Sequence, residues 1–533
     1  MSGRAPWWRG ATVYQVYVRS FADSNGDGVG DFPGLISKLD YVAALGVDAI
    51  WLSPTHPSPN RDWGYDVSDY DIVNPEYGTE ADFDRLLKEA HARGLRIMTD
   101  EVLAHTSDEH AWFVESLKGG EKADWYVWAP AREDGTPPNN WLSAFGGPAW
   151  SYHPARRASY HHKFLRQQPK LNWRADGARA AALAVLDSWL KRGVDGFRLD
   201  VANAFLHDTA LRDNPAVPQS ARDASYWSRA ANMQLHRRDS NLEDNLQVLN
   251  EIRMRVERYP DRFVMGEFSE DPERCGAFAS PSEGLHSGYS FPLLHADKLG
   301  PEFIRDHYRT LARFPAHWPS IAFSNHDVIR TVTRFGGEKA PPALARLLLA
   351  LLVALRGTLL LYQGEELGLP EASLRRDQIR DPIGDLYYPL YRGRDGCRTP
   401  MPWDAAAPNL GFTTGSPWLP LAPEHRELAP SLQERDPQST LSCARRLLAA
   451  RRESDALRLG GIEFLDAPAP VLAFLRTCAN DRVLCAFNMS ADDVSFQSDL
   501  LRHAVPLPIC TDESRIEGDV LAMNPYAAFF AHV

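Results

Sequence analysis

The 533-residue sequence contains little cysteine and no excess of positive charge. Its six cysteines are scattered without a C-x-x-C pair, so we expect neither a disulfide framework nor a cysteine zinc site. Lys and Arg number 58 against 70 Asp and Glu, which gives a net charge of -12. Because phosphate contacts need clustered Lys and Arg, we expect no nucleic acid partner and no binding to an anionic membrane surface.

Long hydrophobic runs are missing as well. The longest, Leu347–Leu355, has nine residues between two arginines, whereas a membrane span needs about 20. We therefore expect a buried helix there. The first twenty residues contain no apolar segment with a small-residue cleavage site, so we expect no secretory signal and a cytoplasmic location. No internal repeat or low-complexity segment is present.

Strand and helix signals alternate through most of the chain. TVYQVYVRSF, VDAIWLSP and LRIMTDEVL are typical of strands. The helices between them end at Gly46 and begin after Thr79, where Asp82 completes a capping box. Beyond residue 175 a helix near Ala180–Arg192 is followed by the strands GFRLDVA, VMGEF, SIAFSN and TLLLYQG. This rhythm predicts an α/β fold, an eight-stranded (β/α) TIM barrel.

Two regions depart from the rhythm. Residues 105–175 are rich in Trp, Gly, Pro and His, which predicts an inserted subdomain after the third strand. After residue 455, short alternating runs without helices predict a C-terminal antiparallel β-sandwich. We assign residues 1–104 and 176–455 to the catalytic barrel (domain A), 105–175 to the inserted subdomain (domain B) and 456–533 to the C-terminal β domain (domain C).

Polar residues close several of the predicted barrel strands. In such barrels the chemistry lies at the carboxyl ends of the strands. A single Asp there is more often a helix cap or an ion-pair partner, but the joint occurrence favours glycosidic-bond chemistry, in which one carboxylate attacks and another carries a proton. Arg198 lies two residues before Asp200 and faces the same side. The residues are Asp100, His105, Arg198, Asp200, Glu267, His326 and Asp327.

The motifs WWRGATVYQVYVRSF, DSNGDGVGD, GYDVSDY, DEVLAHTS, QPKLNW, GFRLDVAN, MGEFSED, FSNHD, LYQGEELGLP and GCRTPMPW occur in this order along the chain. As a set they resemble the α-amylase superfamily (glycoside hydrolase family 13), within it the α-glucosidase and oligo-1,6-glucosidase branch. The chain also resembles bacterial α-glucosidases with transglucosylation activity.

The resemblance implies roles for individual residues. Asp200 matches the nucleophile, Glu267 the general acid/base and Asp327 the third carboxylate, which holds the sugar's 2- and 3-hydroxyls. The family's other substrate-binding residues match Tyr65 as the aromatic platform, His105, Arg198 and His326 around the glucose, and Asp62 with Arg398 as the pair that grips the 4-hydroxyl.

The implied reaction is exo-acting and retaining, with a covalent β-glucosyl-enzyme intermediate. Retention predicts a carboxyl separation of about 5–5.5 Å between Asp200 and Glu267. The expected partners are short α-glucosides of the maltose type and hydroxyl acceptors, which makes transglucosylation available. We expect a monomer or a homodimer.

Linkage preference stays open. Val201 follows the nucleophile, and Val there accompanies α-1,6-acting relatives, yet KADWYVWA and LHDTALRDNP resemble α-1,4-acting enzymes. Lys170 reverses a charge that is Asp in many α-glucosidases. Phe145 and Trp150 line the acceptor side or form the core of domain B.

The segment from Asp23 to Asp31 places oxygen ligands at alternate positions between glycines. Hard cations prefer such ligands, although an Asx-rich turn without metal has the same composition. By resemblance we expect one structural Ca²⁺ (or Mg²⁺). The expected ligands are the side chains of Asp23, Asn25, Asp27 and Asp31 and the backbone carbonyl of Val29.

Two other functions compete. A glucosyltransferase or isomerase of the same fold, such as a trehalose synthase or sucrose isomerase, would use the same carboxylates but retain the leaving sugar. A catalytically dead relative serving as a transporter subunit or binding module would lack the acidic residues, and all three are present here.

Overall fold

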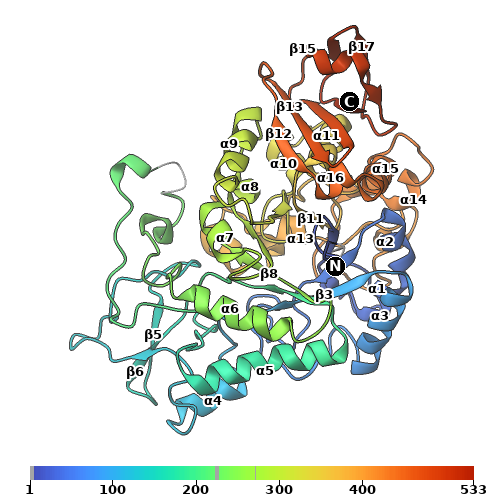
Figure 1. Ribbon diagram of the computed structural model, residues 1–533. Helices are drawn as coiled ribbons and strands as arrows, with labels where there is room; N and C mark the ends of the chain where they lie inside the picture. The colour runs from blue at the N-terminus through green and yellow to red at the C-terminus, as the bar shows by residue number, and fades with distance from the viewer. Residues whose placement is uncertain (1–4, 223–226, 270–271) are drawn as a thin grey trace.

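The structure is a computed structural model that describes residues 5–222, 227–269 and 272–533 (Figure 1). Its centre is a sheet of eight parallel strands in the order β10-β11-β1-β2-β3-β7-β8-β9, with β9 lying next to β10, so that the sheet closes almost completely into the predicted barrel. The strands are β1 (Thr12–Val16), β2 (Ala49–Leu52), β3 (Arg96–Glu101), β7 (Gly196–Leu199), β8 (Phe263–Phe268), β9 (Ser287–Ser290), β10 (Ser320–Ala322) and β11 (Thr358–Tyr362).

Helices surround the barrel because each carries an apolar stripe that packs against the strands. Leu347–Leu355 forms most of α11 and its C-cap, and these residues are buried as predicted. Gly46 ends α2 with a left-handed backbone, and Thr79 with Asp82 forms the predicted capping box of α3. The main helices are α1 (Phe32–Ser37), α2 (Leu39–Leu45), α3 (Glu80–Ala92), α5 (Asp176–Arg192), α6 (Asn245–Val256), α7 (Pro272–Phe278), α9 (Pro301–Leu311), α11 (Pro342–Ala354) and α15 (Thr440–Glu453).

Two details differ from the sequence prediction. The helix that the sequence predicts to end at Gly46, in the segment FPGLISKLDYVAALG, is divided at Lys38 into α1 and α2. Strand β9 was not among the predicted strands, because its sequence SGYS lacks an apolar run.

Shorter helices connect the larger elements: α8 (Pro292–His295), α10 (Thr331–Gly336), α12 (Pro382–Tyr387), α13 (Asp395–Arg398), α14 (Pro430–Gln433) and α16 (Asp455–Leu459).

Between β3 and α5 the chain forms a small layer of its own. It contains α4 (Ala111–Leu117) and an antiparallel sheet, β4-β6-β5, made of β4 (Trp128–Ala129), β5 (Trp150–His153) and β6 (Ala158–His161). Its core includes Trp141 and Trp150, whose rings stack 5.7 Å apart. Trp150 therefore belongs to the core of domain B, one of the two roles left open by the sequence.

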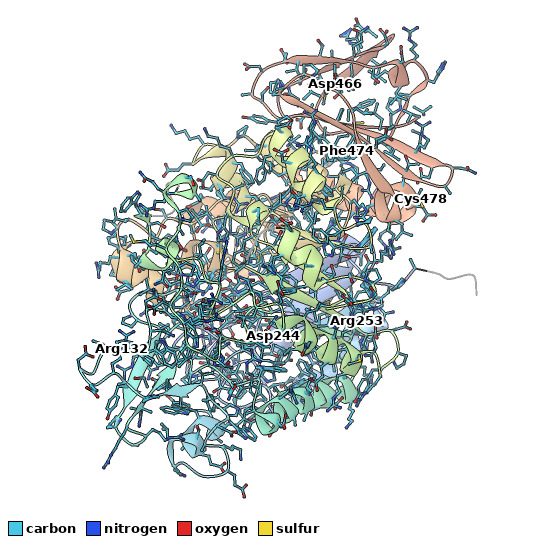
Figure 2. The ribbon with its side chains drawn as sticks, turned by 60° about the vertical axis from the view of Figure 1, so that its left-hand side comes forward. Arg132, Asp244, Arg253, Asp466, Phe474 and Cys478 are labelled. Carbon is cyan, nitrogen blue, oxygen red and sulfur yellow. The ribbon has the colours of Figure 1, made fainter. Side chains whose placement is uncertain are left out.

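The C-terminal segment forms two antiparallel sheets, β12-β13-β14-β19-β16 and β15-β18-β17, that share one apolar cluster, as the predicted sandwich requires. Arg132 of domain B and Asp466 of domain C lie at opposite ends of the molecule (Figure 2). The strands are β12 (Gly461–Phe464), β13 (Val471–Cys478), β14 (Asp481–Asn488), β15 (Val494–Gln497), β16 (Val505–Pro506), β17 (Ser514–Glu517), β18 (Val520–Met523) and β19 (Ala528–His532).

All six cysteines are free, as expected from their scatter. Within the described parts of the chain, no helix combines the length and apolar character needed to cross a bilayer.

Candidate active site

A cavity of about 620 Å³ opens at the carboxyl ends of the barrel strands. It brings together predicted residues that are far apart in the sequence, from domain B, from β8 and from the segments that follow β2, β3, β7 and β10. Those that line it are Asp62, Tyr65, His105, Phe145, Asp200, Val201, Glu267 and Asp327. Arg198, His326 and Arg398 are fully buried beneath them.

Arg198 organises the floor of this cavity. The register of β3 with β7 places Asp100 opposite Arg198. Arg198 Nη1 donates to Asp100 Oδ1 at 2.8 Å and to Asp200 Oδ1 at 2.9 Å, and its Nη2 lies 2.6 Å from Glu267 Oε1. One guanidinium therefore contacts all three carboxyl groups, which ties the two predicted catalytic residues to a common anchor.

Tyr289, from the unpredicted strand β9, completes this anchor. Its hydroxyl accepts from Arg198 Nε at 3.0 Å and donates to Glu267 Oε1 at 3.2 Å. The sequence offered no signal for Tyr289, because neither a motif nor an apolar strand pattern marks it.

Three carboxyl groups around one guanidinium cannot all ionise easily. Burial raises the pKa of Asp200 well above its usual range, and Glu267 and Asp100 raise it further against the opposing effect of Arg198. Burial likewise raises the pKa of Asp100 to about 7. The cluster therefore holds a proton near neutral pH, which acid catalysis at one of its carboxyls requires.

Asp327 has the opposite electrostatic environment. Arg398 Nη2 donates to its Oδ1 at 2.7 Å and Arg394 Nη1 at 3.2 Å. Burial acts to raise the pKa of Asp327, but the guanidiniums of Arg394 and Arg398 outweigh it and hold the pKa well below its ordinary value. Asp327 is therefore a permanent anion beside the cluster that holds the proton.

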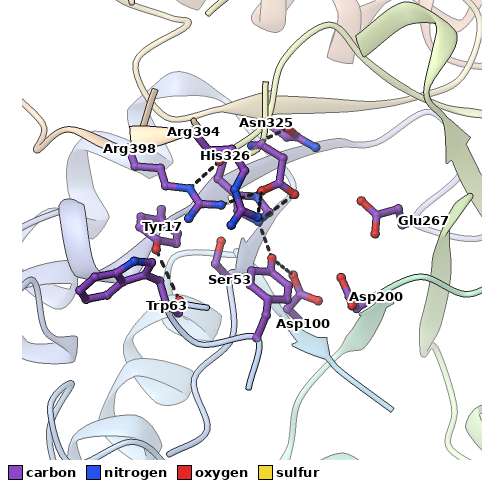
Figure 3. A network of polar contacts seen from close by, with 12 residues as sticks. Tyr17, Ser53, Trp63, Asp100, Asp200, Glu267, Asn325, His326, Arg394 and Arg398 are labelled. Atoms are coloured by element: carbon purple, nitrogen blue, oxygen red, sulfur yellow. Dashed lines mark hydrogen bonds and ion pairs between the residues drawn. The ribbon is translucent and has the colours of Figure 1, made fainter. Parts of the chain in front are cut away.

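The structure does not bring together Asp62 and Arg398, the pair predicted to grip the glucose 4-hydroxyl. Asp62 Oδ1 accepts instead from Arg394 Nη2 at 2.7 Å, and Arg394 also binds Asp381 at 2.8 Å. Arg398 lies deeper, where its Nε donates to the His326 carbonyl at 2.7 Å. Figure 3 shows both arginines beside His326, with Asp200 and Glu267 on the other side of the site. Arg394 is the N-cap of the short helix α13 and Arg398 is its last residue, and spacing alone could not decide which one reaches Asp62.

The two predicted histidines are neutral hydrogen-bonding groups. Burial lowers the pKa of His105 to about 4 and that of His326 to about 3. The His326 ring stacks on Tyr65 at 5.2 Å, and its Nδ1 lies 2.7 Å from Gln15 Nε2. Because that amide donates, Nδ1 accepts and Nε2 carries the proton toward the Tyr65 hydroxyl, 2.6 Å away. The Tyr65 hydroxyl in turn donates to Asp100 at 2.9 Å.

Val201 and Phe145 both line the cavity. Val201 has a left-handed backbone with φ of 44°, and its N–H donates to Glu267 Oε2 at 3.2 Å. The Arg394 guanidinium lies 5.2 Å from the centre of the Phe145 ring. Phe145 therefore lines the cavity beside Arg394 and does not belong to the apolar core of domain B.

The loop that carries the predicted metal ligands is folded by its own hydrogen bonds. Asp23, Asn25 and Asp27 each accept from a backbone N–H two residues further on, at 2.8–2.9 Å. Asp31 caps α1 by accepting from Gly34 N, and its second oxygen accepts from Ser24 N and Oγ. The Asp23 carboxylate is the most fully used, because its two oxygens also accept from Gly26 N, Gly28 N and the Thr413 hydroxyl. The lone pairs that remain on Asn25 and Asp27 fit a hard cation. Among the described residues, no group of three His, Cys, Asp or Glu side chains is arranged to hold a metal.

Comparison with known proteins agrees with this geometry. The alpha-amylase catalytic domain family matches residues 15–460. A probable alpha-glucosidase of Rhizobium meliloti is 46% identical over 99% of this chain and 97% of its own length. An oligo-1,6-glucosidase of Parageobacillus thermoglucosidasius is 35% identical over 91% of this chain and 90% of its own.

Solved structures agree as well. The crystal structure of the alpha-glucosyl transfer enzyme XgtA is 48% identical, with a TM-score of 0.96 over 99% of this chain and all of that one. The trehalulose synthase MutB of Pseudomonas mesoacidophila is 32% identical, with a TM-score of 0.89 over 99% of this chain and all of that one. This chain is a glycoside hydrolase of the α-amylase family, in its α-glucosidase and oligo-1,6-glucosidase branch.

Proposed function

We propose that this enzyme is an exo-acting, retaining α-glucosidase that releases glucose from the non-reducing end of short α-glucosides. The observation that carries the proposal is the shared anchor of Asp200 and Glu267 on Arg198, at the floor of a cavity with Asp327 as a fixed anion. Because both carboxyls bind one guanidinium, they lie close together, as the two carboxyls of a retaining enzyme must. We expect a separation of about 5–5.5 Å between the Asp200 and Glu267 carboxyl groups.

In the first step, an Asp200 oxygen attacks C1 of the glucose while Glu267 donates its proton to the glycosidic oxygen. The C1–O bond breaks, the second sugar leaves as an alcohol, and a β-glucosyl ester forms on Asp200. In the second step, Glu267 takes a proton from water, whose oxygen attacks C1 and breaks the ester. Two inversions return the α-configuration.

Exo action follows from the closed end of the cavity. Asp62, Arg394 and Asp327 form one ion-pair chain, Asp62–Arg394 at 2.7 Å and Arg394–Asp327 at 3.2 Å. A glucose placed against this chain would have its 4-hydroxyl among charged hydrogen-bonding groups. No room would remain there for a further sugar on the non-reducing side.

Transfer of glucose to an acceptor alcohol is the second candidate. It is favoured by the similarity to XgtA, which is named as a glucosyl transfer enzyme, and to MutB, named as a trehalulose synthase. Transfer needs only that another hydroxyl takes the place of water in the second step. Products from maltose and from sucrose separate the cases. Free glucose as main product supports hydrolysis, transfer oligosaccharides support a transferase, and an isomeric disaccharide from sucrose supports an isomerase.

The roles of the two carboxyls can be tested with α-glucosyl fluoride and azide. We expect Asp200→Gly to lose activity by a factor on the order of 10⁴ and, with azide, to give the β-glucosyl azide, because azide enters from the face that the carboxylate vacates. Glu267→Ala should lose activity on maltose by roughly 10²–10⁴-fold and give the α-glucosyl azide, because azide attacks the intermediate. A wild-type rate in Asp200→Gly, or exchanged azide products, would refute the assignment.

We also propose that the loop Asp23–Asp31 binds one Ca²⁺ or Mg²⁺ with a structural role. The side-chain oxygens of Asp23, Asn25, Asp27 and Asp31 and the carbonyl of Val29 would hold it. The loop precedes α1 and is distant in sequence from the strand ends that carry the carboxyls, so the cation would stabilise the fold and take no part in the reaction. The six free cysteines support the expected cytoplasmic location.

A further inference from the structure

A second polar cluster borders the cavity and centres on Asp239. This carboxylate is fully buried in the long connection between β7 and α6. Its Oδ1 accepts from Asn214 Nδ2 at 3.0 Å, and its Oδ2 lies 2.9 Å from His236 Nδ1 and 3.4 Å from Lys163 Nζ. Burial acts to raise the pKa of Asp239, but Lys163 and His236 outweigh it and hold the pKa well below its ordinary value.

The groups that Asp239 holds face the cavity. Lys163, His236 and Ser240 all line it, although Lys163 belongs to domain B and the other two to the β7–α6 connection. Lys163 Nζ also donates to Ser240 Oγ at 3.1 Å. Asp239 thus joins two separate parts of the chain into one polar rim, defined by Lys163, His236 and Ser240.

The position of the rim identifies the part of the substrate it meets. Asn203, three residues after Asp200, donates to Asn241 Oδ1 and to Ser269 Oγ, both at 2.8 Å. Ser269 follows Glu267 by two residues, so the rim adjoins the strand ends of β7 and β8. The ion-pair chain of Asp62, Arg394 and Asp327 comes instead from the loops after β2, β10 and β11. In the strand order of the barrel these strands are separate from β7 and β8, so the chain and the rim lie at different parts of the cavity.

We propose that Asp239 is a positioning residue that fixes Lys163 against the hydroxyls of the leaving sugar or of the acceptor alcohol. His236, whose Nε2 lies 3.0 Å from the Ala231 carbonyl, holds Asp239 in place from the other side. The proposal rests on the glucosidase function above. The Lys163 ammonium has three N–H groups. Two of them donate to Asp239 and Ser240, so the third is left for a substrate hydroxyl. Asp239 acts only through these neighbours and does not contact the reacting atoms.

The test compares Asp239→Asn on two substrates. Maltose has a leaving sugar that reaches the rim, whereas α-glucosyl fluoride has a leaving atom too small to reach it. We expect kcat/KM for maltose to fall roughly tenfold or more, with kcat/KM for the fluoride within twofold of wild type. The ratio of transfer to hydrolysis products should fall as well. Asp208→Asn is the matched control, because Asp208 pairs with Arg212 in the same connection without contacting the rim; we expect both substrates to be unaffected.

A double variant tests whether Asp239 acts through its partner. If it does, the double variant Asp239→Asn with Lys163→Met should have nearly the same kcat/KM for maltose as Lys163→Met alone. The proposal would be overturned if Asp239→Asn lowered kcat/KM equally for maltose and for the fluoride, or did not lower it for maltose. It would also be overturned if the effects of the two substitutions were fully additive in the double variant. Should Asp239→Asn fail to fold, Lys163→Met and His236→Gln are judged by the same comparison of substrates. A wild-type enzyme inactive on both substrates would refute the proposed function instead.

Discussion

Val201 carries backbone strain at the centre of the site. A β-branched residue with a left-handed backbone is disfavoured by about 1–3 kcal/mol, and Val201 has φ of 44°. Its N–H bond to Glu267 and its buried surroundings hold it in place. The strained backbone directs the Val201 side chain to the cavity wall beside Glu267.

Substitution of Val201 should therefore change linkage preference. We expect Val201→Ala to raise the ratio of kcat/KM for maltose to that for isomaltose by roughly tenfold or more, because small changes of an apolar wall discriminate by that much. Initial rates on the two disaccharides measure it. Val328→Ala, in another apolar residue that lines the cavity, serves as control. An unchanged ratio in Val201→Ala would show that linkage is set elsewhere.

Arg394 offers a second prediction at this scale. Its guanidinium binds Asp62, Asp327 and Asp381, so its loss leaves three carboxylates without that partner. We expect Arg394→Ala to lower kcat/KM for maltose by about 30-fold or more, because breaking a buried charge pair costs about 2–5 kcal/mol. Arg392→Ala, which removes an exposed guanidinium bound to Ser373, should stay within twofold of wild type. Similar losses in both variants would contradict the proposed role of Arg394 in the glucose pocket.

The loop Asp23–Asp31 gives a prediction at the scale of one element. If it binds a cation, a chelator should lower the thermal midpoint of unfolding by a few degrees, and added Ca²⁺ should restore it, since a ligand of the folded state stabilises that state. We expect Asp27→Ala to abolish this response. Asp134→Ala is the control, because Asp134 is also exposed and accepts from a backbone N–H two residues on. Equal chelator responses in the wild type and Asp27→Ala would exclude the loop.

Over the whole molecule, buried histidines set the response to acid. Burial lowers the pKa of ten of them, to about 4 or about 3 in eight cases. They are His105, His110, His161, His162, His207, His286, His307, His317, His326 and His425. Because the unfolded chain takes up these protons near pH 6.5 and the folded chain only at lower pH, stability falls as the pH drops from about 6.5 toward 4.

Each such histidine lowers the free energy of unfolding by up to about 1.4 kcal/mol for every pH unit by which the pH falls in that window. Four carboxyls act in the opposite sense, because burial raises their pKa to about 6 or about 7: Asp66, Asp100, Glu365 and Glu371. Because the histidines outnumber these carboxyls, we expect the thermal midpoint to fall between pH 6.5 and pH 5. Scanning calorimetry across this range measures it. His425→Gln should reduce by about one the number of protons taken up on unfolding, so that the free energy of unfolding depends less steeply on pH. His503→Gln, at an exposed position, should leave this dependence unchanged. A midpoint independent of pH from 6.5 to 5 would contradict the prediction.

Much of the architecture could be predicted because its signals are local. The capping box at Thr79 and the C-cap at Gly46 depend on residues within one helical turn. The carboxyls of Asp200, Glu267 and Asp327 could be found because each closes an apolar strand, and parallel strands of a barrel end on one face. Strand β9 escaped prediction because two serines and a glycine give no apolar period.

The sequence by itself thus determined the barrel, the order of its insertions and the three carboxylates, because periodicity and strand-end position are properties of neighbouring residues. Only the tertiary structure decided that Arg394 and not Arg398 reaches Asp62, that Tyr289 joins the anchor on Arg198, and that Asp239 ties Lys163 to His236. The long-range contacts among these, Arg394 with Asp62, Tyr289 with Arg198 and Lys163 with Asp239, link residues at least 76 positions apart. The direction of a side chain across such a distance depends on how the intervening elements pack, which no local pattern records.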